Sequence, residues 1–183
     1  MKTQKGFSLI ELLIVVAIIL IIAAIAVPNL LRSRMAANEA SAAGALRTMA
    51  TANVSYSTAY NVGFAGDLNQ LGPPAAGVPA DSTAADQLDA TLSGVAAGTS
   101  NTSTKSGYVF TYVPLVAAPT TAAPNGSYTV VAVPVTPGST GQSTFCVDQT
   151  NVVMKDTSGG VTTAAGNSCV LDGWAIGGTV NPL

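Results

Sequence analysis

The sequence predicts an α+β protein in which one long N-terminal helix packs on a C-terminal antiparallel β-sheet. Three observations lead to this fold class. An apolar run fills residues 7–27, a stretch of helix-forming residues continues to Tyr60, and short runs of alternating β-favouring residues follow between turn signals. The 183 residues suffice for one domain with a buried core and an appendage.

The apolar run forms the first half of the predicted helix. Only Ser8 and Glu11 interrupt it between residues 7 and 27. A helix of roughly 20 such residues crosses the hydrocarbon of a bilayer, which is about 30 Å thick. A secretory signal peptide is the rival interpretation, but the run is too long for one, and its small-residue cleavage candidates at 23–26 lie directly before Pro28. We therefore expect a transmembrane segment.

Two residues of this segment are unusual for a membrane span. Glu11 is a carboxylate near the end of the span, which costs free energy unless it has a partner or reaches headgroup water. Pro28 lacks an N–H, and its ring clashes with the carbonyl four residues back, so we expect the helix to kink or loosen at residues 24–28.

The second half of the helix is predicted to be amphipathic. Residues 29–60 contain no proline and are rich in Ala, Leu, Met, Arg and Glu. A narrow apolar stripe at helical spacing consists of Met35, Ala42, Leu46, Met49, Tyr56 and Tyr60. The polar residues Glu39, Thr48, Thr51 and Ser55 lie largely off this stripe. We expect this half to pack on a globular head, in a helix of about 50 residues in all.

After the helix the composition shifts to Ala, Gly, Ser, Thr and Pro. The triplet Gly72-Pro73-Pro74 ends any regular element. The pattern from Thr83 to Asp86 predicts a short helix that Gly94 closes.

Four short strands are predicted in the last half of the chain. They are residues 108–113, 128–135, 144–147 and 152–155. Because Asn125-Gly126 and Pro137-Gly138 are turn signals between the runs, we expect an antiparallel meander with one face on the helix stripe. In the Gly/Thr/Ser-rich tail that follows, Trp174 is the one large side chain that can anchor it.

The composition argues against an enzyme. Histidine is absent, so there is no Ser-His-Asp relay, His-ligated zinc or imidazole proton shuttle, and two cysteines cannot form a four-thiolate metal site. We interpret Asp148, Asp156 and Asp172 as isolated, solvated loop carboxylates without a calcium-binding loop. The net charge of −2 and the scattered basic residues do not indicate nucleic-acid binding. We expect no cofactor and no metal.

Cys146 and Cys169 are the two cysteines. This even count near the C-terminus suits one disulfide in an exported domain, and two buried free thiols are the alternative.

The N-terminus resembles a known processing site. The run from Lys5 to Ile14, Lys-Gly-Phe-Ser-Leu-Ile-Glu-Leu-Leu-Ile, closely resembles that of type IV prepilins and type II secretion pseudopilins, and the resemblance continues through Pro28-Asn29-Leu30. The rest of the chain is similar at the level of architecture, with a helical spine, an Ala/Gly-rich variable region, an antiparallel sheet and a C-terminal disulfide loop. The resemblance therefore implies a pilin-like fold.

The resemblance also implies roles for single residues. A prepilin peptidase and methyltransferase would cut after Gly6 and methylate the new amine of Phe7. The Glu11 carboxylate would neutralise the Phe7 amine of an adjacent subunit and set the register of a helical filament. Pro28 would be the place where the helix melts or bends as it leaves the bilayer.

The same resemblance divides the chain into three parts. Residues 1–6 would be a leader peptide, residues 7–31 a transmembrane and filament-core helix, and residues 32–183 a periplasmic or extracellular head. The protein would cross the bacterial inner membrane once before assembly. The pilus or secretion assembly machinery would then build it into a cell-surface pilus or a periplasmic pseudopilus.

Three alternatives stay open at this stage. The chain could be a pseudopilin of a type II secretion system, or a membrane-anchored adhesive or binding domain that does not polymerise. Electron conduction through Tyr56, Tyr60 and Phe64, which are spaced four apart, is the third, although core packing explains these rings better.

Overall fold

The computed structural model describes residues 7–183 except 163, 164 and 167. The described residues form two compact units, the first ending at Arg34 and the second comprising Met35–Leu183. The helix α1, Leu9–Tyr60, contributes to both and has 52 residues, which confirms the predicted single long helix. Gly6 lies outside the described residues.

The part of α1 in the first unit exposes apolar side chains on all sides. Every described residue up to Arg34 is exposed except Ala23, which is half-buried. By length and composition alone, this is the one helix among the described residues that could cross a membrane. Pro28 lies inside α1, and the helix continues on both sides of it, so the missing hydrogen bond does not end the helix.

The second part of α1 buries one face, as predicted. Ala42, Leu46, Met49 and Tyr56 of the stripe are buried. The buried face is wider than predicted, because it also includes Ala43, Ala45, Ala50, Ala52 and Asn53. Alanine carries too little apolar surface to mark a stripe in the sequence, but it lets the aromatic side chains of a sheet approach the helix closely.

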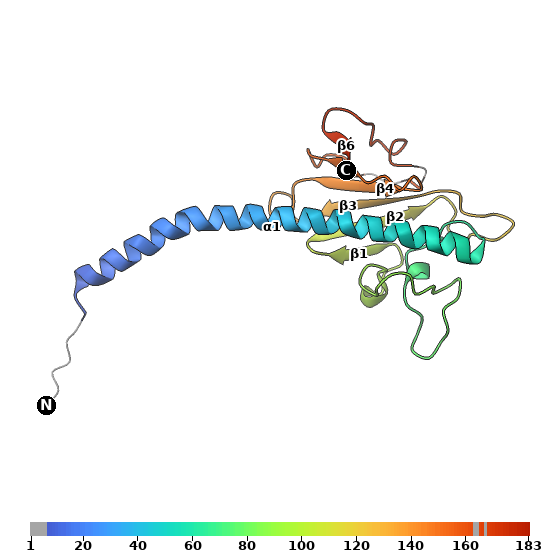
Figure 1. Cartoon of the computed structure of the whole chain (residues 1–183), viewed down its shortest axis with the longest axis horizontal. Coiled ribbons are helices and arrows are strands. Elements are labelled where there is room, and N and C mark those ends of the chain that lie inside the picture. The colour runs from blue at the N-terminus through green and yellow to red at the C-terminus, as the bar shows by residue number, and fades with distance from the viewer. Residues whose placement is uncertain (1–6, 163–164, 167) are drawn as a thin grey trace. The chain divides into compact units, whose positions relative to one another are not determined.

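The sheet has six antiparallel strands that follow each other in sequence order (Figure 1). They are β1 (Thr102–Lys105), β2 (Tyr108–Pro114), β3 (Tyr128–Pro134), β4 (Thr144–Asp148), β5 (Met154–Asp156) and β6 (Val180–Pro182). The predicted meander is confirmed for β2 to β5. The two edge strands were missed, because β1 is polar and β6 is only three residues long. Ser106 and Gly107, both with positive φ, close the tight turn from β1 to β2.

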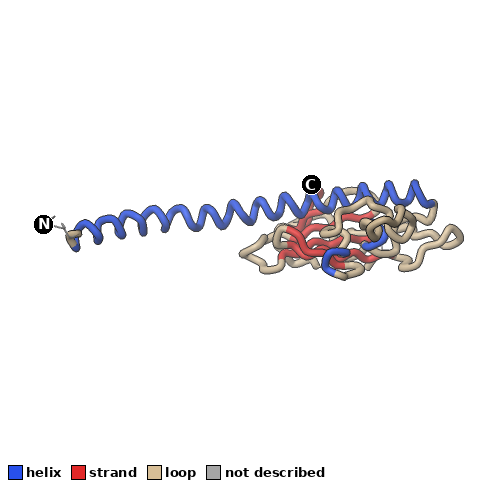
Figure 2. Tube along the Cα trace, turned by 90° about the horizontal axis from the view of Figure 1, so that it is seen from below, coloured by secondary structure: helices blue, strands red, loops and turns tan. Residues whose placement is uncertain are grey.

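Both faces of the sheet are covered. The second part of α1 runs alongside the strands of the sheet (Figure 2). The buried face of α1 shares a core with Tyr108, Phe110, Tyr128, Val130 and Phe145. The intervening residues Val131 and Cys146 form a second core with residues of the C-terminal tail. Trp174, the predicted anchor of the tail, is fully buried there. The sheet is therefore the middle layer between α1 and the tail.

The helix predicted from Thr83 to Gly94 does not form. The backbone N–H groups of residues 85–88 donate to carbonyls of residues 70–72 at 2.7–2.9 Å, so they cannot form helical bonds to the fourth residue before them. Asp86 has a φ of 54°, which ends any right-handed helix. Two short 3₁₀ helices, η1 (Asn69–Leu71) and η2 (Val95–Ala97), form nearby instead.

Two buried asparagines tie the segment after α1 to the rest of the head. Asn53 Oδ1 accepts hydrogen bonds from the Ala65 N–H at 3.2 Å and the Tyr112 hydroxyl at 3.1 Å. Asn125 Nδ2 donates to the Ala65 carbonyl at 2.9 Å, and its Oδ1 accepts from the Val116 N–H at 3.1 Å. Both asparagines are fully buried, so these amides satisfy backbone groups that have no access to water.

The aromatic rings in this region pack in pairs. The ring centroids of Tyr56 and Tyr60 are 5.0 Å apart, and those of Phe64 and Tyr128 are 4.9 Å apart. The centroids of Tyr112 and Tyr128 are separated by 5.5 Å. These are ordinary distances for aromatic packing in a core.

The Asn53 amide gives a test of this arrangement. Replacing Asn53 by Leu leaves the Ala65 N–H and the Tyr112 hydroxyl without this acceptor, and we expect the free energy of unfolding to fall by about 1–3 kcal/mol. Thr51→Ala, on the exposed face of α1, should change it by less than about 0.5 kcal/mol. Denaturant unfolding of the full chain in detergent measures both. Equal stability of the two variants would contradict a structural role for this amide.

Candidate functional site

The first turn of α1 is closed by a side chain. Ser8 stands directly before the helix, and its backbone N–H donates to Glu11 Oε2 at 2.9 Å. The Ser8 carbonyl accepts the first helical bond, from the Leu12 N–H at 3.3 Å. A glutamate three residues after an N-cap serine is the arrangement of a capping box. A carboxylate at this position is also favoured by the helix dipole.

This contact was missed at the sequence level. Glu11 was treated as lacking any partner within its own chain, although the Ser-x-x-Glu pattern at residues 8–11 is a capping signal. The backbone donor uses one lone pair of one oxygen, whereas an ionised carboxylate has room for about four donors. Glu11 therefore keeps acceptor capacity for a cation from elsewhere.

The surroundings of Glu11 are apolar. Phe7 and Leu9 are 87% and 80% exposed, and the large aliphatic side chains that follow, up to Leu31, are each about half exposed or more. Glu11 is the only ionisable side chain in residues 7–31. The site is a single carboxylate at one end of an apolar surface.

Of the other site residues predicted at the N-terminus, the structure describes Phe7 and Pro28 but not Gly6. Phe7 is described and exposed, two residues before the start of the helix, whereas Gly6 falls in the undescribed stretch. Pro28 lies inside α1. Their roles in processing and assembly stay predictions.

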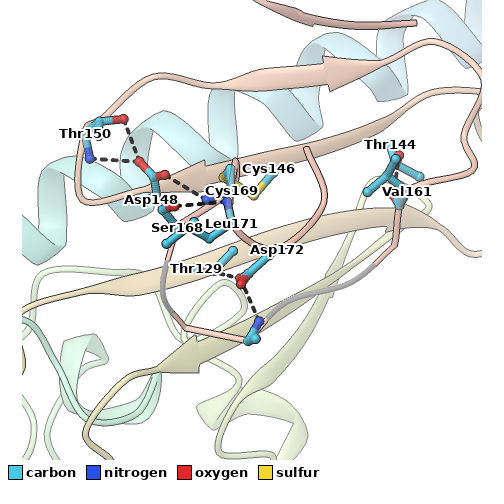
Figure 3. The surroundings of a disulfide bond; sticks show 11 residues. Thr129, Thr144, Cys146, Asp148, Thr150, Val161, Ser168, Cys169, Leu171 and Asp172 are labelled. Carbon is cyan, nitrogen blue, oxygen red and sulfur yellow. Dashed lines mark hydrogen bonds between the residues drawn. A yellow bond between two sulfur atoms is a disulfide. The ribbon is translucent and has the colours of Figure 1, made fainter. Parts of the chain in front are cut away.

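The disulfide expected in the C-terminal part is present (Figure 3). Cys146 in β4 is bonded to Cys169 in the tail, with 6.0 Å between their Cα atoms and a sequence separation of 23. Both residues are fully buried, and neither is a free thiol. In the chain-entropy model a loop of this length stabilises the fold by about 3 kcal/mol. The disulfide thus holds a tail that is poor in apolar side chains.

Asp148 and Asp172, interpreted above as solvated, are in fact buried. Asp148 Oδ2 accepts the Cys169 N–H at 2.8 Å (Figure 3). Asp172 Oδ2 accepts the Thr129 hydroxyl at 2.8 Å and the Ala165 N–H at 2.7 Å. The prediction failed because these partners are distant in sequence. Among the described residues no group of three potential metal ligands gathers around either carboxylate.

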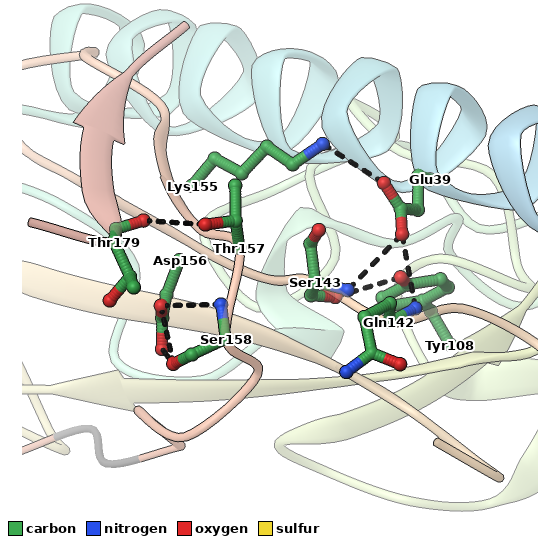
Figure 4. Close-up of polar contacts among 9 residues, drawn as sticks. All are labelled: Glu39, Tyr108, Gln142, Ser143, Lys155, Asp156, Thr157, Ser158 and Thr179. Carbon is green, nitrogen blue, oxygen red and sulfur yellow. Dashed lines mark hydrogen bonds and ion pairs between the residues drawn. The ribbon is translucent and has the colours of Figure 1, made fainter. Parts of the chain in front are cut away.

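Asp156, the third of these aspartates, is fully buried at the end of β5. It accepts the N–H and hydroxyl of Ser158 (Figure 4). It also accepts the N–H groups of Gly160 and Val161. Burial by itself would raise the pKa of this carboxyl, but the hydrogen bonds from Val161 and Ser158 lower it to about 2. Asp156 fixes the start of the tail.

Glu39 connects α1 to the sheet. Its Oε2 pairs with Lys155 Nζ at 2.9 Å, and its Oε1 accepts the N–H groups of Gln142 and Ser143 at 3.0 and 3.1 Å (Figure 4). Burial opposes ionisation, but these backbone bonds and Lys155 hold the pKa of the Glu39 carboxyl below its ordinary value. The expectation that Glu39 lies off the packed face was wrong, because Glu39 is four residues after Met35 and three before Ala42, a spacing that places it on the same side of the helix.

Known proteins match the N-terminus. A family model described as a prokaryotic N-terminal methylation motif matches residues 1–27. The chain is 62% identical over 39 residues to the type IV wide pilus major component PilA4 of Thermus thermophilus, a match that covers 21% of this chain. The matched segment spans only 30% of the length of that relative. No solved structure matches the chain.

Together, the long N-terminal helix and the six-stranded antiparallel sheet form a pilin-like α+β fold. The N-terminus carries a prokaryotic methylation motif and is similar over 39 residues to a type IV pilus component.

The hydrogen bonds of Asp156 predict a pH-dependent contribution to stability. Because the pKa of this carboxyl falls from 3.8 to about 2 on folding, its contribution is complete above the unfolded value and is lost as the pH falls through about 2. We expect Asp156→Asn to be less stable than wild type near neutral pH, with the difference shrinking as the pH approaches about 2. Denaturant unfolding of the full chain at several pH values measures this.

Asp86→Asn is the matched control for that series, since the exposed Asp86 carboxylate accepts no hydrogen bond within the described residues. The difference in the free energy of unfolding between Asp86→Asn and wild type should change little over the same pH range. A constant deficit of Asp156→Asn at every pH would contradict the assignment.

Proposed function

We propose that this protein is the structural subunit of a type IV pilus-like filament. It is inserted in the inner membrane, cleaved after Gly6, methylated at the amine of Phe7 and polymerised through its N-terminal helix. The observation that carries the proposal is the lone Glu11 carboxylate in the first turn of a helical segment with exposed apolar side chains on all sides. The methylation motif over residues 1–27 supports it.

Cleavage after Gly6 supplies the cation that Glu11 requires. It creates a charged amine on Phe7, and in the filament this amine pairs with the Glu11 carboxylate of an adjacent subunit. Two opposite charges in apolar surroundings attract strongly, and a charge buried without its partner costs several kcal/mol. Only the correct axial stagger satisfies both charges, so the pair sets the filament register.

The rest of the proposed division follows from this step. Residues 1–6 are the leader, residues 7–31 span the membrane and then the filament core, and residues 32–183 form the head outside the cytoplasm. Moving residues 7–31 from lipid to a bundle exchanges one apolar contact for another at little net cost. Pro28 provides a weak point in the helix for this transfer, since its position has no backbone donor.

The similarity to PilA4, which is named as a major pilus component, favours a surface pilus over a secretion pseudopilus. This match covers 39 residues. Long surface fibres that contain this chain would support the pilus. Loss of secretion from cells that carry no fibres would identify a pseudopilin instead. A subunit that stays monomeric in the membrane would exclude both filaments.

Processing is tested by intact mass. The mature protein should lack residues 1–6 and carry one added methyl group. Gly6→Leu should remain full-length in the membrane, because a small residue must enter the peptidase site. Gly126→Ala, in an exposed turn with no atom within 4 Å of the added methyl, should be processed like wild type. Normal cleavage of Gly6→Leu would contradict the proposed site.

Assembly is tested at Glu11 with two variants. Glu11→Val should be inserted and cut but should not form filaments. Glu11→Gln retains an oxygen for the Ser8 N–H and removes only the charge, so it separates helix capping from ion pairing. We expect both variants to fail in assembly, as judged by electron microscopy of sheared fibres. Wild-type fibre yield from Glu11→Gln would show that capping, and not the ion pair, is the role of Glu11.

A further inference from the structure

The head contains few charged side chains, and most of them have partners within the chain. Two ion pairs join Glu39 to Lys155 and Asp89 to Lys105. The remaining bonded carboxylates, each accepting at least one backbone N–H, are Asp67, Asp81, Asp148, Asp156 and Asp172. Within the described part of the head, this leaves the cations Arg32, Arg34 and Arg47 and the anion Asp86, whose charged groups make no contact.

Arg47 lies on the exposed face of α1 between two adjoining grooves. One groove, of about 390 Å³, is lined by Ala36, Ala40 and Ala43 of the helix, by the ion pair of Glu39 with Lys155, and by Phe145 and Leu183. The other, of about 400 Å³, is lined mainly by Ala50, Thr51 and Val54. Arg47 lines both. Because the alanine side chains of the helix are small, the backbone of another chain can approach the guanidinium closely.

The same face of the helix offers no side chain at Gly44, and no atom lies within 4 Å of the Cβ position there. Arg47 is exposed, so pairing with a carboxylate contributes little affinity, but it can fix the orientation of the group that it binds.

Asp86 is presented on a rigid frame. The N–H groups of Ala85 and Asp86 donate to the carbonyls of Gln70 and Gly72 at 2.8 and 2.9 Å. The N–H groups of residues 87 and 88 both donate to the Leu71 carbonyl, at 2.8 and 2.7 Å. This frame holds Asp86 at a φ of 54°, a conformation that costs free energy for a residue other than glycine. The backbone that carries the exposed carboxylate is thus held in place before any partner arrives.

We propose that Arg47 of one subunit binds the Asp86 carboxylate of a second copy, with the turn at residues 85–88 seated in the groove along α1. This inference rests on the proposed filament. A planar guanidinium can bind a carboxylate with two parallel hydrogen bonds, which fixes the orientation as well as the distance.

The two halves of this contact are different surfaces of the same unit. Such a heterologous contact repeats from one copy to the next and builds an open helical assembly when the rotation does not close. Arg32 and Arg34 are less suitable partners for Asp86, because they lie at the end of the apolar segment, where lipid headgroups can satisfy a cation.

Paired cysteines test the contact in assembled fibres. A chain carrying Arg47→Cys and Asp86→Cys should form disulfides between neighbours under mild oxidation and give a ladder of covalent multimers on a non-reducing gel. The native Cys146 and Cys169 are already bonded to each other. Thr58→Cys with Asp86→Cys is the matched control, since Thr58 is on the exposed part of the same helix about three turns away. The control should give no ladder.

Charge exchange gives an independent readout. Arg47→Glu and Asp86→Arg should each reduce fibre yield at unchanged subunit levels in the membrane, and the double variant should restore it. If wild-type fibres form with a methylated N-terminus but neither the ladder nor the rescue appears, the contact is wrong and the filament stands. If wild type forms no fibre, the proposed function itself fails, and the contact with it.

Discussion

The Glu11 carboxylate imposes the strongest constraint on this molecule, because a full negative charge at the end of an apolar helix must be neutralised before it can be buried. The Ser8 N–H and the helix dipole contribute partial positive charge at the right place. A hydrogen bond to a charged group contributes about 1.5–3 kcal/mol, whereas burying an isolated ion costs several kcal/mol or more. The capping bond is therefore enough near water but not in a dry core, so burial of this helix in the proposed filament would require a cation from a neighbour.

The head follows a different principle, in which small helix side chains pack against the aromatic residues of the sheet and a few buried polar groups fix the loops. Alanine provides most of the buried face of α1, so the sheet can approach closely. Asn53, Asn125 and Glu39 then fix the position of the helix against the loops by accepting or donating bonds to backbone groups. The tail depends on the disulfide, on Trp174 and on aspartates that accept several N–H groups each. Loops with few apolar residues are ordered here by hydrogen bonds.

The elements predicted correctly are those whose signal is local. The long helix has continuous apolar or helix-forming residues, strands β2 to β5 alternate in period two, and Trp174 is the one large residue of its segment. The errors lie where distant contacts decide. The N–H groups of residues 85–88 are taken by residues 70–72, which removes the predicted helix. Glu39 and the buried aspartates find partners up to about a hundred residues away, and neither propensity nor periodicity contains that information.

Because the chain has few charged residues, each unpaired charged group can have a large effect on how two subunits orient. In a chain with only 9% charged residues, an exposed guanidinium has few carboxylates to choose from, so one complementary contact can exclude most wrong orientations. Pairing at the surface contributes little to affinity, since water and salt screen it within about 8–10 Å. Apolar contacts between N-terminal helices are strong but do not distinguish one rotation or stagger from another. A filament of such subunits needs both kinds of interaction, with apolar contacts for cohesion and a few isolated charges for geometry.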